Sequence, residues 1–335
     1  MRNYNKDRAI QPGSCEIQRY PLICGMRKIE IPVTGIFSEK ELLWFLDRGF
    51  DECVYKVFPD KIRRAFEAGN ERMLVDIYPL RDRLVVAWLT GEPSENGINF
   101  VRDFLADWFD LDIDLTPFYG LLSPYPRLDY LSKRYEGLRF TGIPDLFEAL
   151  AWAIIGQQIN LRFAYTIKRR LVEAFGSFVE YEGNKYYLFP SPATIAKARV
   201  PDLRAMQFSG KKAEYLITVA EAIASKAIDK TILNDLPDMD SRLKMLTNLR
   251  GIGHWTASYV LMKSLKERSS IPYGDAGLLN ALVNHGIITE KNELPAIRSF
   301  FSGFAGWESY LVFYLWRSLA PMEGDVFYPR TSTGT

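Results

Sequence analysis

A short turn between two helix-like stretches carries residues that can bind a phosphate group. Within residues 240–265, Gly251 and Gly253 stand one residue apart, and a second helical pattern begins at His254. Glycine can adopt a positive φ and lets another molecule approach the backbone closely. The turn and the start of the second helix then leave backbone N–H groups pointing outward, where a phosphate can be bound. A bare Gly-x-Gly turn is also typical of an ordinary corner between two helices.

The complete string around this turn is more specific than its two glycines. It reads L-x-G-I-G-x-x-T-A from Leu249 to Ala257 and resembles the helix–hairpin–helix motif of DNA-repair glycosylases. Contacts of this kind position a protein on DNA without reading its sequence. The resemblance implies a DNA-binding set consisting of Arg250, Gly251, Ile252, Gly253, His254 and Thr256.

A carboxylate follows the motif at the distance found in that superfamily. Asp275 ends the loop 271–275, I-P-Y-G-D, and lies 20 residues after Trp255. In the superfamily a Gly/Pro-rich loop ends in a catalytic aspartate at about this position, so the resemblance implies that Asp275 is catalytic. Aspartate is also a good N-cap for a helix that begins at Ala276. Both roles can hold together, because a capping residue at a cleft can also face a ligand.

The resemblance extends over essentially the whole chain, to the DNA-3-methyladenine glycosylase II family. Residues 153–158, A-I-I-G-Q-Q, are similar to the family's A-I-L-G-Q stretch, in which the residue after the first glutamine fills the gap left by an extruded base. Gln158 stands at that position, and Gln157 joins it in the predicted DNA-binding set. Both are also typical of a polar helix end.

Three aromatic residues match positions at which the family surrounds the base. They are Trp255, Tyr259 and Trp316, and the first two are four residues apart, hence on one helix face. Aromatic residues at helical spacing are more often core, and Tyr310, Phe313 and Tyr314 are expected to be core.

The family also holds a monovalent cation at its hairpin. By position the ligands would be the backbone carbonyls of Thr247, Leu249 and Ile252, binding Na⁺ or K⁺ in a structural role. No cofactor is expected for catalysis. Gly274 departs from the family, which often has a second acidic residue before the catalytic aspartate.

The elements that position these residues predict an α+β protein with two parts. Residues 1–114 are expected to form an antiparallel sheet with helices on one face, from strand patterns at 28–34, 53–58, 73–78 and 84–89 and a helix at 98–109. Ser38 and Glu41 predict a capping box. Residues 115–335 are nearly all helix and are expected to form a two-lobed glycosylase core with the hairpin at about 240–265.

Composition excludes several other classes of protein. Cys15, Cys24 and Cys53 fit neither a disulfide framework nor the four clustered cysteines of an iron–sulfur glycosylase. The N-terminus lacks the apolar centre of a secretory signal and no apolar run is long enough for a membrane span, so the protein is expected in the cytoplasm, associated with the nucleoid. It is also expected to be a monomer. The formal net charge is +1, but acidic residues prevail in 1–114 and basic residues in 115–335. A phosphate-facing surface is therefore expected in the second part.

These residues together predict a monofunctional DNA glycosylase that removes alkylated purines from double-stranded DNA containing damaged bases. One alternative is a bifunctional glycosylase for oxidised purines, which places a lysine two residues after the second glycine of the hairpin, where this chain has Trp255. Another is a non-enzymatic DNA-binding protein that uses the hairpin alone.

Overall fold

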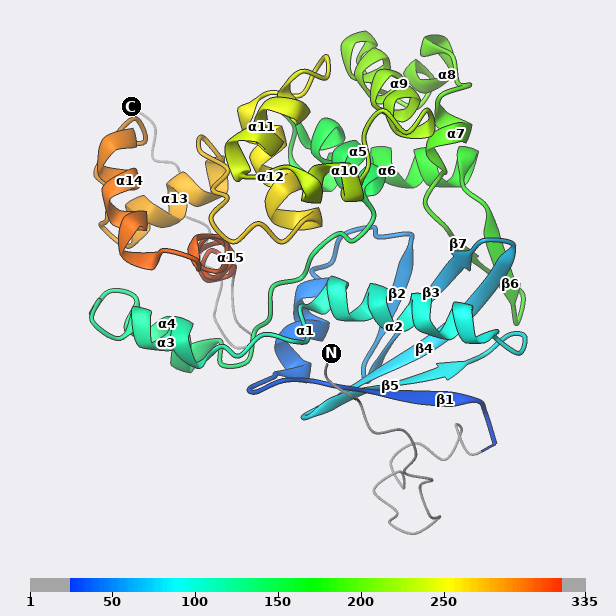
Figure 1. Ribbon diagram of the computed structural model, residues 1–335, viewed down its shortest axis with the longest axis horizontal. Helices are drawn as coiled ribbons and strands as arrows, with labels where there is room; N and C mark the ends of the chain where they lie inside the picture. Colours follow the sequence, from blue (N-terminus) through cyan, green and yellow to red (C-terminus); the bar gives the residue numbers. More distant parts are fainter. Residues whose placement is uncertain (1–24, 321–335) are drawn as a thin grey trace, which may run out of the picture.

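A five-stranded antiparallel sheet forms the first part of the computed structural model, which describes residues 25–320 (Figure 1). The strand order is β1-β5-β4-β3-β2. The strands are β1 (Lys28–Pro32), β2 (Tyr55–Phe58), β3 (Lys61–Ala68), β4 (Glu71–Leu80) and β5 (Arg83–Trp88). The predicted α+β class is confirmed, and β1, β2, β4 and β5 overlap the four predicted strand stretches.

Strand β3 is the one that the sequence pattern did not predict. Its adjacent Arg63 and Arg64 are both buried, one on each face of the sheet, and so break the alternation of apolar and polar residues. Each is paired with a carboxylate: Arg63 with Asp76 at 2.6 Å and Arg64 with Glu148 at 3.4 Å. Because both arginines are buried in ion pairs, the apolar–polar alternation that marks a strand is lost here, and the sequence pattern does not predict β3.

One face of the sheet is covered by two helices, α1 (Glu39–Leu46) and α2 (Glu95–Phe109). The hydroxyl of Ser38 accepts the predicted bond from the N–H of Glu41 at 3.2 Å. The predicted capping box is nevertheless wrong, because the Glu41 carboxylate is buried and pairs with Arg317 at 2.7 Å. The Glu41 side chain, which would have bonded the backbone N–H of Ser38 in a capping box, instead pairs with the distant Arg317.

The other face of the sheet is contacted by a hairpin from the helical part. Its strands are β6 (Phe178–Tyr181) and β7 (Asn184–Tyr187). Tyr186 packs on Ala65 and Leu74, and its hydroxyl accepts a 3.1 Å hydrogen bond from Arg63. The hairpin therefore connects this face of the sheet to the helical part of the protein.

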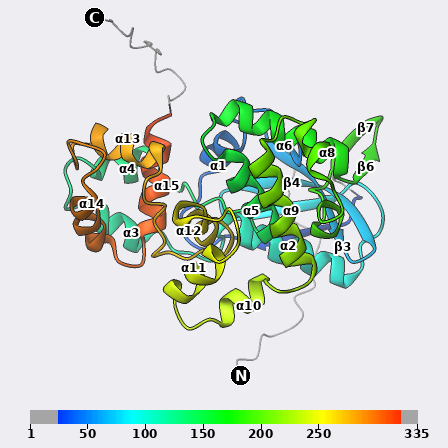
Figure 2. The ribbon, with the colours of Figure 1, turned by 90° about the horizontal axis from the view of Figure 1, so that it is seen from above.

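The helices that follow residue 114 form two lobes with separate hydrophobic cores (Figure 2). The first lobe contains α5 (Leu146–Gly156), α6 (Leu161–Phe175), α7 (Pro192–Ile195), α8 (Val200–Arg204), α9 (Gly210–Ala224), α10 (Lys230–Asp235), α11 (Met239–Thr247) and α12 (His254–Ser264). The second combines two distant segments and contains α3 (Thr116–Leu122), α4 (Asp129–Arg134), α13 (Ala276–Asn284), α14 (Leu294–Phe301), a 3₁₀ turn (Ser302–Phe304) and α15 (Glu308–Ser318).

Two further observations concern the predictions made from composition. Within residues 25–320, no helix is long and apolar enough to cross a membrane. Cys53 is a buried free thiol, and burial raises its pKa to about 12. Cys15, Cys24 and the N-terminal segment expected to lack a secretory signal lie outside the described residues.

Candidate active site

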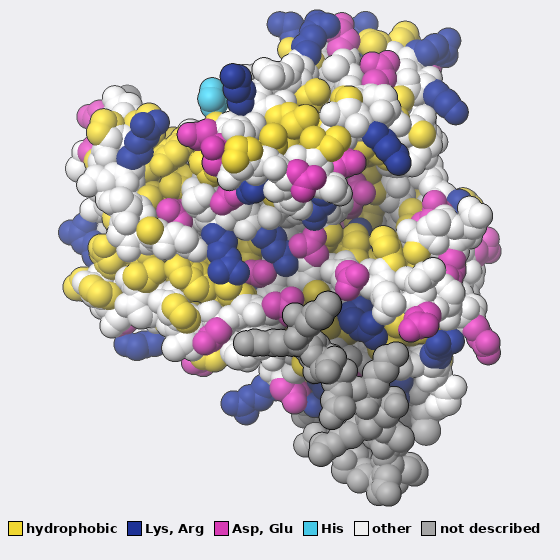
Figure 3. All heavy atoms as spheres, in the orientation of Figure 1, with side chains coloured by type: hydrophobic (Ala, Val, Ile, Leu, Met, Phe, Trp, Pro, Cys, Tyr) yellow, Lys and Arg dark blue, Asp and Glu magenta, His cyan; other side chains and the backbone are white. Residues whose placement is uncertain are grey.

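The predicted site residues meet where the two helical lobes face each other. Trp255 and Tyr259 come from α12 of the first lobe, and Trp316 comes from α15 of the second. Asp275 lies between them, at the end of the loop before α13. The face in Figure 3 is hollowed between the lobe of α13 and α14 and the hairpin helices α11 and α12, and hydrophobic side chains line the hollow.

Both oxygens of the Asp275 carboxylate have fixed partners. Oδ1 accepts the N-cap hydrogen bond from the backbone N–H of Leu278 at 2.8 Å and a second from Nε1 of Trp316 at 2.9 Å. Oδ2 accepts from Nε1 of Trp255 at 3.2 Å. The predicted cap is confirmed, and Oδ2, with one partner fewer, keeps more capacity to face a ligand.

A glycine one residue into α13 makes room for this arrangement. A Cβ atom at Gly277 would lie 3.1 Å from Oδ1 of Asp275 and 3.2 Å from the indole of Trp316. These contacts are tighter than an ordinary van der Waals contact. Gly277 therefore lets the Trp316 indole reach the carboxylate.

The three predicted pocket aromatics lie in one group. The rings of Trp255 and Tyr259 are 5.6 Å apart and nearly parallel, and those of Tyr259 and Trp316 are 6.2 Å apart. Tyr310, Phe313 and Tyr314 are buried in the second lobe, as predicted. A group of electron-rich rings beside a carboxylate can bind a flat cationic group by stacking and cation–π attraction.

Three residues beside this group were missed by the sequence analysis. Trp152 of α5 donates from its Nε1 to the hydroxyl of Tyr259 at 3.0 Å, and its ring lies 4.7 Å from that of Tyr165 on α6. The guanidinium of Arg48, from the part before residue 114 that contains the five-stranded sheet (the sheet domain), interacts electrostatically with both tyrosines. No local pattern indicates these residues, because three separate elements bring them to the site.

The hairpin turn has the conformation that its sequence predicts at only one of its glycines. Gly251 has φ +91°, and a Cβ atom there would lie 2.1 Å from the ring of Tyr215. Gly253 has φ −85° and open space around it, so the expectation of positive φ is wrong at this position. Its lack of a side chain instead leaves the surface above the turn clear.

Backbone donors and charged side chains gather at this turn. Gly253 is the N-cap of α12, so the N–H groups of residues 254–256 have no intrahelical acceptor. His254 is exposed, and Arg250 is exposed and paired with Glu214 at 2.8 Å. The side chains of Ile252 and Thr256 are buried, so only their backbone could contact DNA, and the N–H of Ile252 already donates to the Leu249 carbonyl.

Of the two glutamines that follow α5, one is hydrogen-bonded to the hairpin and the other is exposed. The Gln157 amide donates to the Gly251 carbonyl and to the Thr256 hydroxyl, both at 3.1 Å, and so braces the hairpin. Gln158 is exposed and has φ +55°, in the left-handed region that a non-glycine residue rarely adopts. Of the two, Gln158 is free to enter a bound duplex.

The carbonyls predicted to bind a monovalent cation lie around the same turn. Thr247 is the last residue of α11, so its carbonyl has no intrahelical partner. The Leu249 carbonyl accepts one bond, from Ile252 at 3.1 Å, and keeps its second lone pair. Neutral oxygens of this kind fit Na⁺ or K⁺.

Two lysines near the end of α12, Lys263 within the helix and Lys266 two residues after it, are bonded to groups other than Asp275. Lys263 donates to the carbonyl of Thr141 and lies over the rings of Phe45, Phe140 and Phe313. Burial lowers its pKa to about 7. Lys266 bonds to Asp110 at 3.1 Å.

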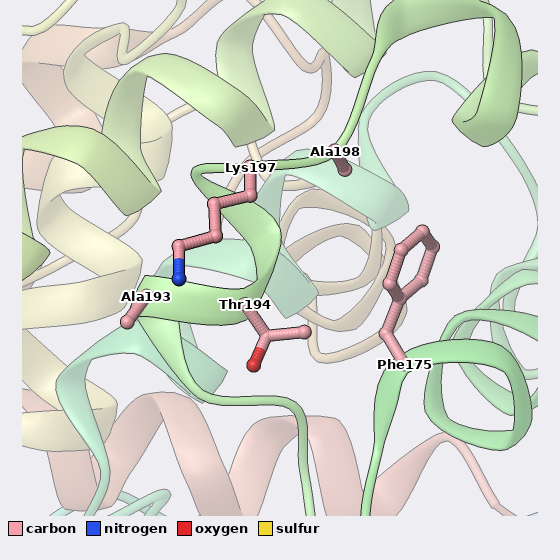
Figure 4. A pocket seen from close by; sticks show the side chains of 5 residues that line it. All are labelled: Phe175, Ala193, Thr194, Lys197 and Ala198. Atoms are coloured by element: carbon pink, nitrogen blue, oxygen red, sulfur yellow. The ribbon is translucent and has the colours of Figure 1, made fainter.

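A pocket elsewhere on the surface does not contain the predicted site residues (Figure 4). Its walls come from the end of α6 and from α7 and the residues after it: Phe175, Ala193, Thr194, Lys197 and Ala198. It has no carboxylate, so the chemistry of Asp275 has no counterpart there.

Comparisons with protein families agree with this geometry. Residues 151–301 match the model described as HhH-GPD superfamily base excision DNA repair protein. Residues 60–150 match the model described as 8-oxoguanine DNA glycosylase, N-terminal domain. The first match contains the hairpin and the carboxylate, and the second contains most of the sheet.

Individual relatives cover nearly the whole chain. A DNA-3-methyladenine glycosylase of Bacillus subtilis is 37% identical over 87% of this chain and 97% of its own length. The solved structure of a 3-methyladenine DNA-glycosylase from Archaeoglobus fulgidus superposes with a TM-score of 0.75 at 26% identity, covering 87% of this chain and 97% of that one. An 8-oxoguanine glycosylase/lyase of Clostridium acetobutylicum, solved with double-stranded DNA, has a TM-score of 0.63 at 18% identity over 80% of this chain and 98% of that one, which shows a shared fold.

Proposed function

Because this chain belongs to the DNA-3-methyladenine glycosylases of the HhH-GPD superfamily, we propose that it removes alkylated purines from DNA with Asp275 as its catalytic carboxylate. The observation that carries the proposal is the group formed by Asp275 with the indoles of Trp255 and Trp316. The chain is a DNA-binding repair enzyme, a hydrolase of the N-glycosidic bond. 3-Methyladenine and 7-methylguanine are the proposed bases.

Docking on DNA would use the backbone of the hairpin. The open surface at Gly253 and the free N–H groups that begin α12 suit a phosphate. Thr247, Leu249 and Ile252 would hold Na⁺ or K⁺ through their carbonyls, and the ion would brace the hairpin beside that phosphate. Gln158, exposed and left-handed, would fill the gap that the extruded nucleotide leaves, offsetting part of the few kcal/mol that extrusion costs.

The base would then stack among Trp255, Tyr259 and Trp316. Alkylation at a purine ring nitrogen makes the base cationic, which aromatic faces favour, and a good leaving group. Breaking the C1′–N bond develops positive charge on the sugar, which a carboxylate held in position stabilises. The negative charge of Asp275 would stabilise the sugar cation, and its Oδ2 would orient the attacking water.

The product would be an intact strand with an abasic site. A bifunctional glycosylase needs an amine to attack C1′, and Trp255 occupies the position of its lysine. Lys263 is buried against Thr141 and Lys266 is paired with Asp110, so neither amine faces Asp275. We place the enzyme in the cytoplasm, associated with the nucleoid, acting as a monomer.

A base-release assay tests this function. Duplex DNA treated with a methylating agent should release 3-methyladenine and 7-methylguanine as free bases when the enzyme is added. Duplex containing 8-oxoguanine opposite cytosine serves as the comparison. Release of 8-oxoguanine without release of methylated bases would place the chain in the oxidised-purine branch, and release of neither would favour a binding protein.

A further inference from the structure

The hydroxyl of Tyr259 accepts one hydrogen bond, from Trp152, and among residues 25–320 its own proton has no hydrogen-bonded acceptor. Resting on the function proposed above, we propose that this hydroxyl donates a hydrogen bond to the extruded base, and that Trp152 is the positioning residue that aims it. The ligand class is a purine with an acceptor on the edge that reaches the hydroxyl. The bond would matter most for damaged bases that are neutral.

Trp152 determines which way the hydroxyl proton of Tyr259 can point. An indole Nε1 can only donate, so the oxygen of Tyr259 accepts from Trp152 at 3.0 Å and cannot send its own proton there. Arg48, the nearby cation, is also only a donor. Among residues 25–320, no acceptor is hydrogen-bonded to this proton, and burial raises the pKa of Tyr259, which keeps the phenol protonated. The proton is therefore available to a ligand among the three rings.

Trp152 is held from behind by parts of both domains. Its ring lies against Tyr165, which stacks on Phe50 of the sheet domain with ring centres 4.9 Å apart. The ammonium of Lys168 lies 5.7 Å from the centre of the Trp152 ring. Lys168 is itself fixed by Glu52 of the sheet domain and Glu148 of α5, both at 3.0 Å.

Through these contacts behind Trp152, the sheet domain helps to position residues of the active site. Phe50 and Glu52 lie in the loop after α1, so the orientation of the Tyr259 hydroxyl depends on contacts that cross the domain boundary. A side chain braced on two sides loses little orientational freedom when a base arrives. The geometry suits a fixed donor rather than an adaptable one.

The chemistry differs between cationic and neutral bases. When the C1′–N bond breaks, its electron pair goes to the base, and water adds to C1′ and loses a proton. A cationic base leaves as a neutral molecule, and the water's proton goes to solvent. A neutral base leaves as an anion and takes up a proton from solvent, so a donor that stabilises the developing negative charge assists its departure.

Single-turnover release of two bases from defined duplexes tests this inference: hypoxanthine, which is neutral, and 7-methylguanine, which is cationic in DNA. Tyr259→Phe keeps the ring and should slow hypoxanthine release about tenfold, the effect of one hydrogen bond to a developing charge. It should slow 7-methylguanine release much less. Trp152→Phe should produce the same selective loss, and no further loss when Tyr259 is already Phe.

Tyr186→Phe is the matched control, because it removes a tyrosine hydroxyl that bonds Arg63 on the sheet and should change neither rate. Equal slowing of both bases by Tyr259→Phe, or an effect of Trp152→Phe that persists in the Tyr259→Phe background, would overturn the inference. Wild-type enzyme that releases 7-methylguanine but no hypoxanthine would also overturn it and leave the proposed function standing. Failure to release either base would instead contradict the proposed function.

Discussion

The hairpin around Gly251 and the pocket around Asp275 share one helix, α12, but are built by different means. The hairpin is a run of consecutive residues, it is largely exposed, and backbone groups make its surface. The pocket joins side chains of α5, α6, α12, α15 and the loop before α13, and most of its bonds run between side chains. Changes on the exposed side of the hairpin, as at Gly253, should leave the fold intact, whereas the pocket depends throughout on the packing of distant elements.

The difference matches what each region would do. Phosphates recur along any duplex, so a surface of backbone donors suffices to grip them. Cleavage needs a carboxylate and rings held in a narrow range of positions, because small displacements of catalytic groups cost rate steeply. We therefore expect changes in the pocket to reduce rate and changes in the hairpin to reduce affinity.

The largest expected effect is that of Asp275→Asn. Asparagine retains N-cap ability, but the variant lacks the charge that would stabilise the sugar cation. Single-turnover release of 7-methylguanine should fall about 10³-fold, while the affinity for duplex DNA stays within a few-fold of wild type. Release at the wild-type rate from purified variant would show that another group is the catalytic carboxylate.

The second-largest effect is a loss of stability when the buried ion pairs of Lys168, behind the pocket, are broken. Lys168→Met leaves Glu52 facing no ammonium and leaves Glu148 with Arg64 alone. The free energy of unfolding should fall by about 3 kcal/mol, as for other buried pairs that lose one partner. Urea denaturation measures this.

Lys133→Met is the control for that variant, because its pair with Asp129 is exposed. Its unfolding free energy should change by less than about 1 kcal/mol. Equal losses in the two variants would mean that the ions behind the pocket do not link the domains.

The smallest effect is expected at the hairpin. Gly253→Val has room and an ordinary φ, so the fold should persist while the new side chain blocks the approach of phosphate. Affinity for any duplex should fall about tenfold, regardless of sequence, and wild-type binding should weaken as salt rises. Electrophoretic mobility shifts with two unrelated duplexes measure both.

Gly251→Val provides the contrast, because its Cβ would collide with Tyr215 and its backbone has φ +91°. It should lower the thermal midpoint, which Gly253→Val should not. A loss of affinity confined to one sequence would count against docking through the backbone.

The sequence indicated what is local in this molecule. The hairpin string, the cap at Asp275 and the aromatic spacing of Trp255 and Tyr259 are each determined within a few residues. Strand β3, the role of Glu41 and Trp152 were missed or misassigned, because each depends on a partner far along the chain: Glu148 for Arg64 of β3, Arg317 for Glu41, and Tyr259 for Trp152. Apolar periodicity identifies a face, but it does not identify what that face meets.

The nucleophile that attacks C1′ distinguishes a hydrolase from a lyase. Borohydride added during turnover on methylated duplex should trap no covalent protein–DNA adduct, because the amines of Lys263 and Lys266 are bonded to Thr141 and Asp110 and water would attack C1′. Free methylated base should accumulate with the strand intact, as a denaturing gel would show. An efficient adduct that disappears in Asp275→Asn would contradict hydrolysis by water and assign the chain a lyase activity.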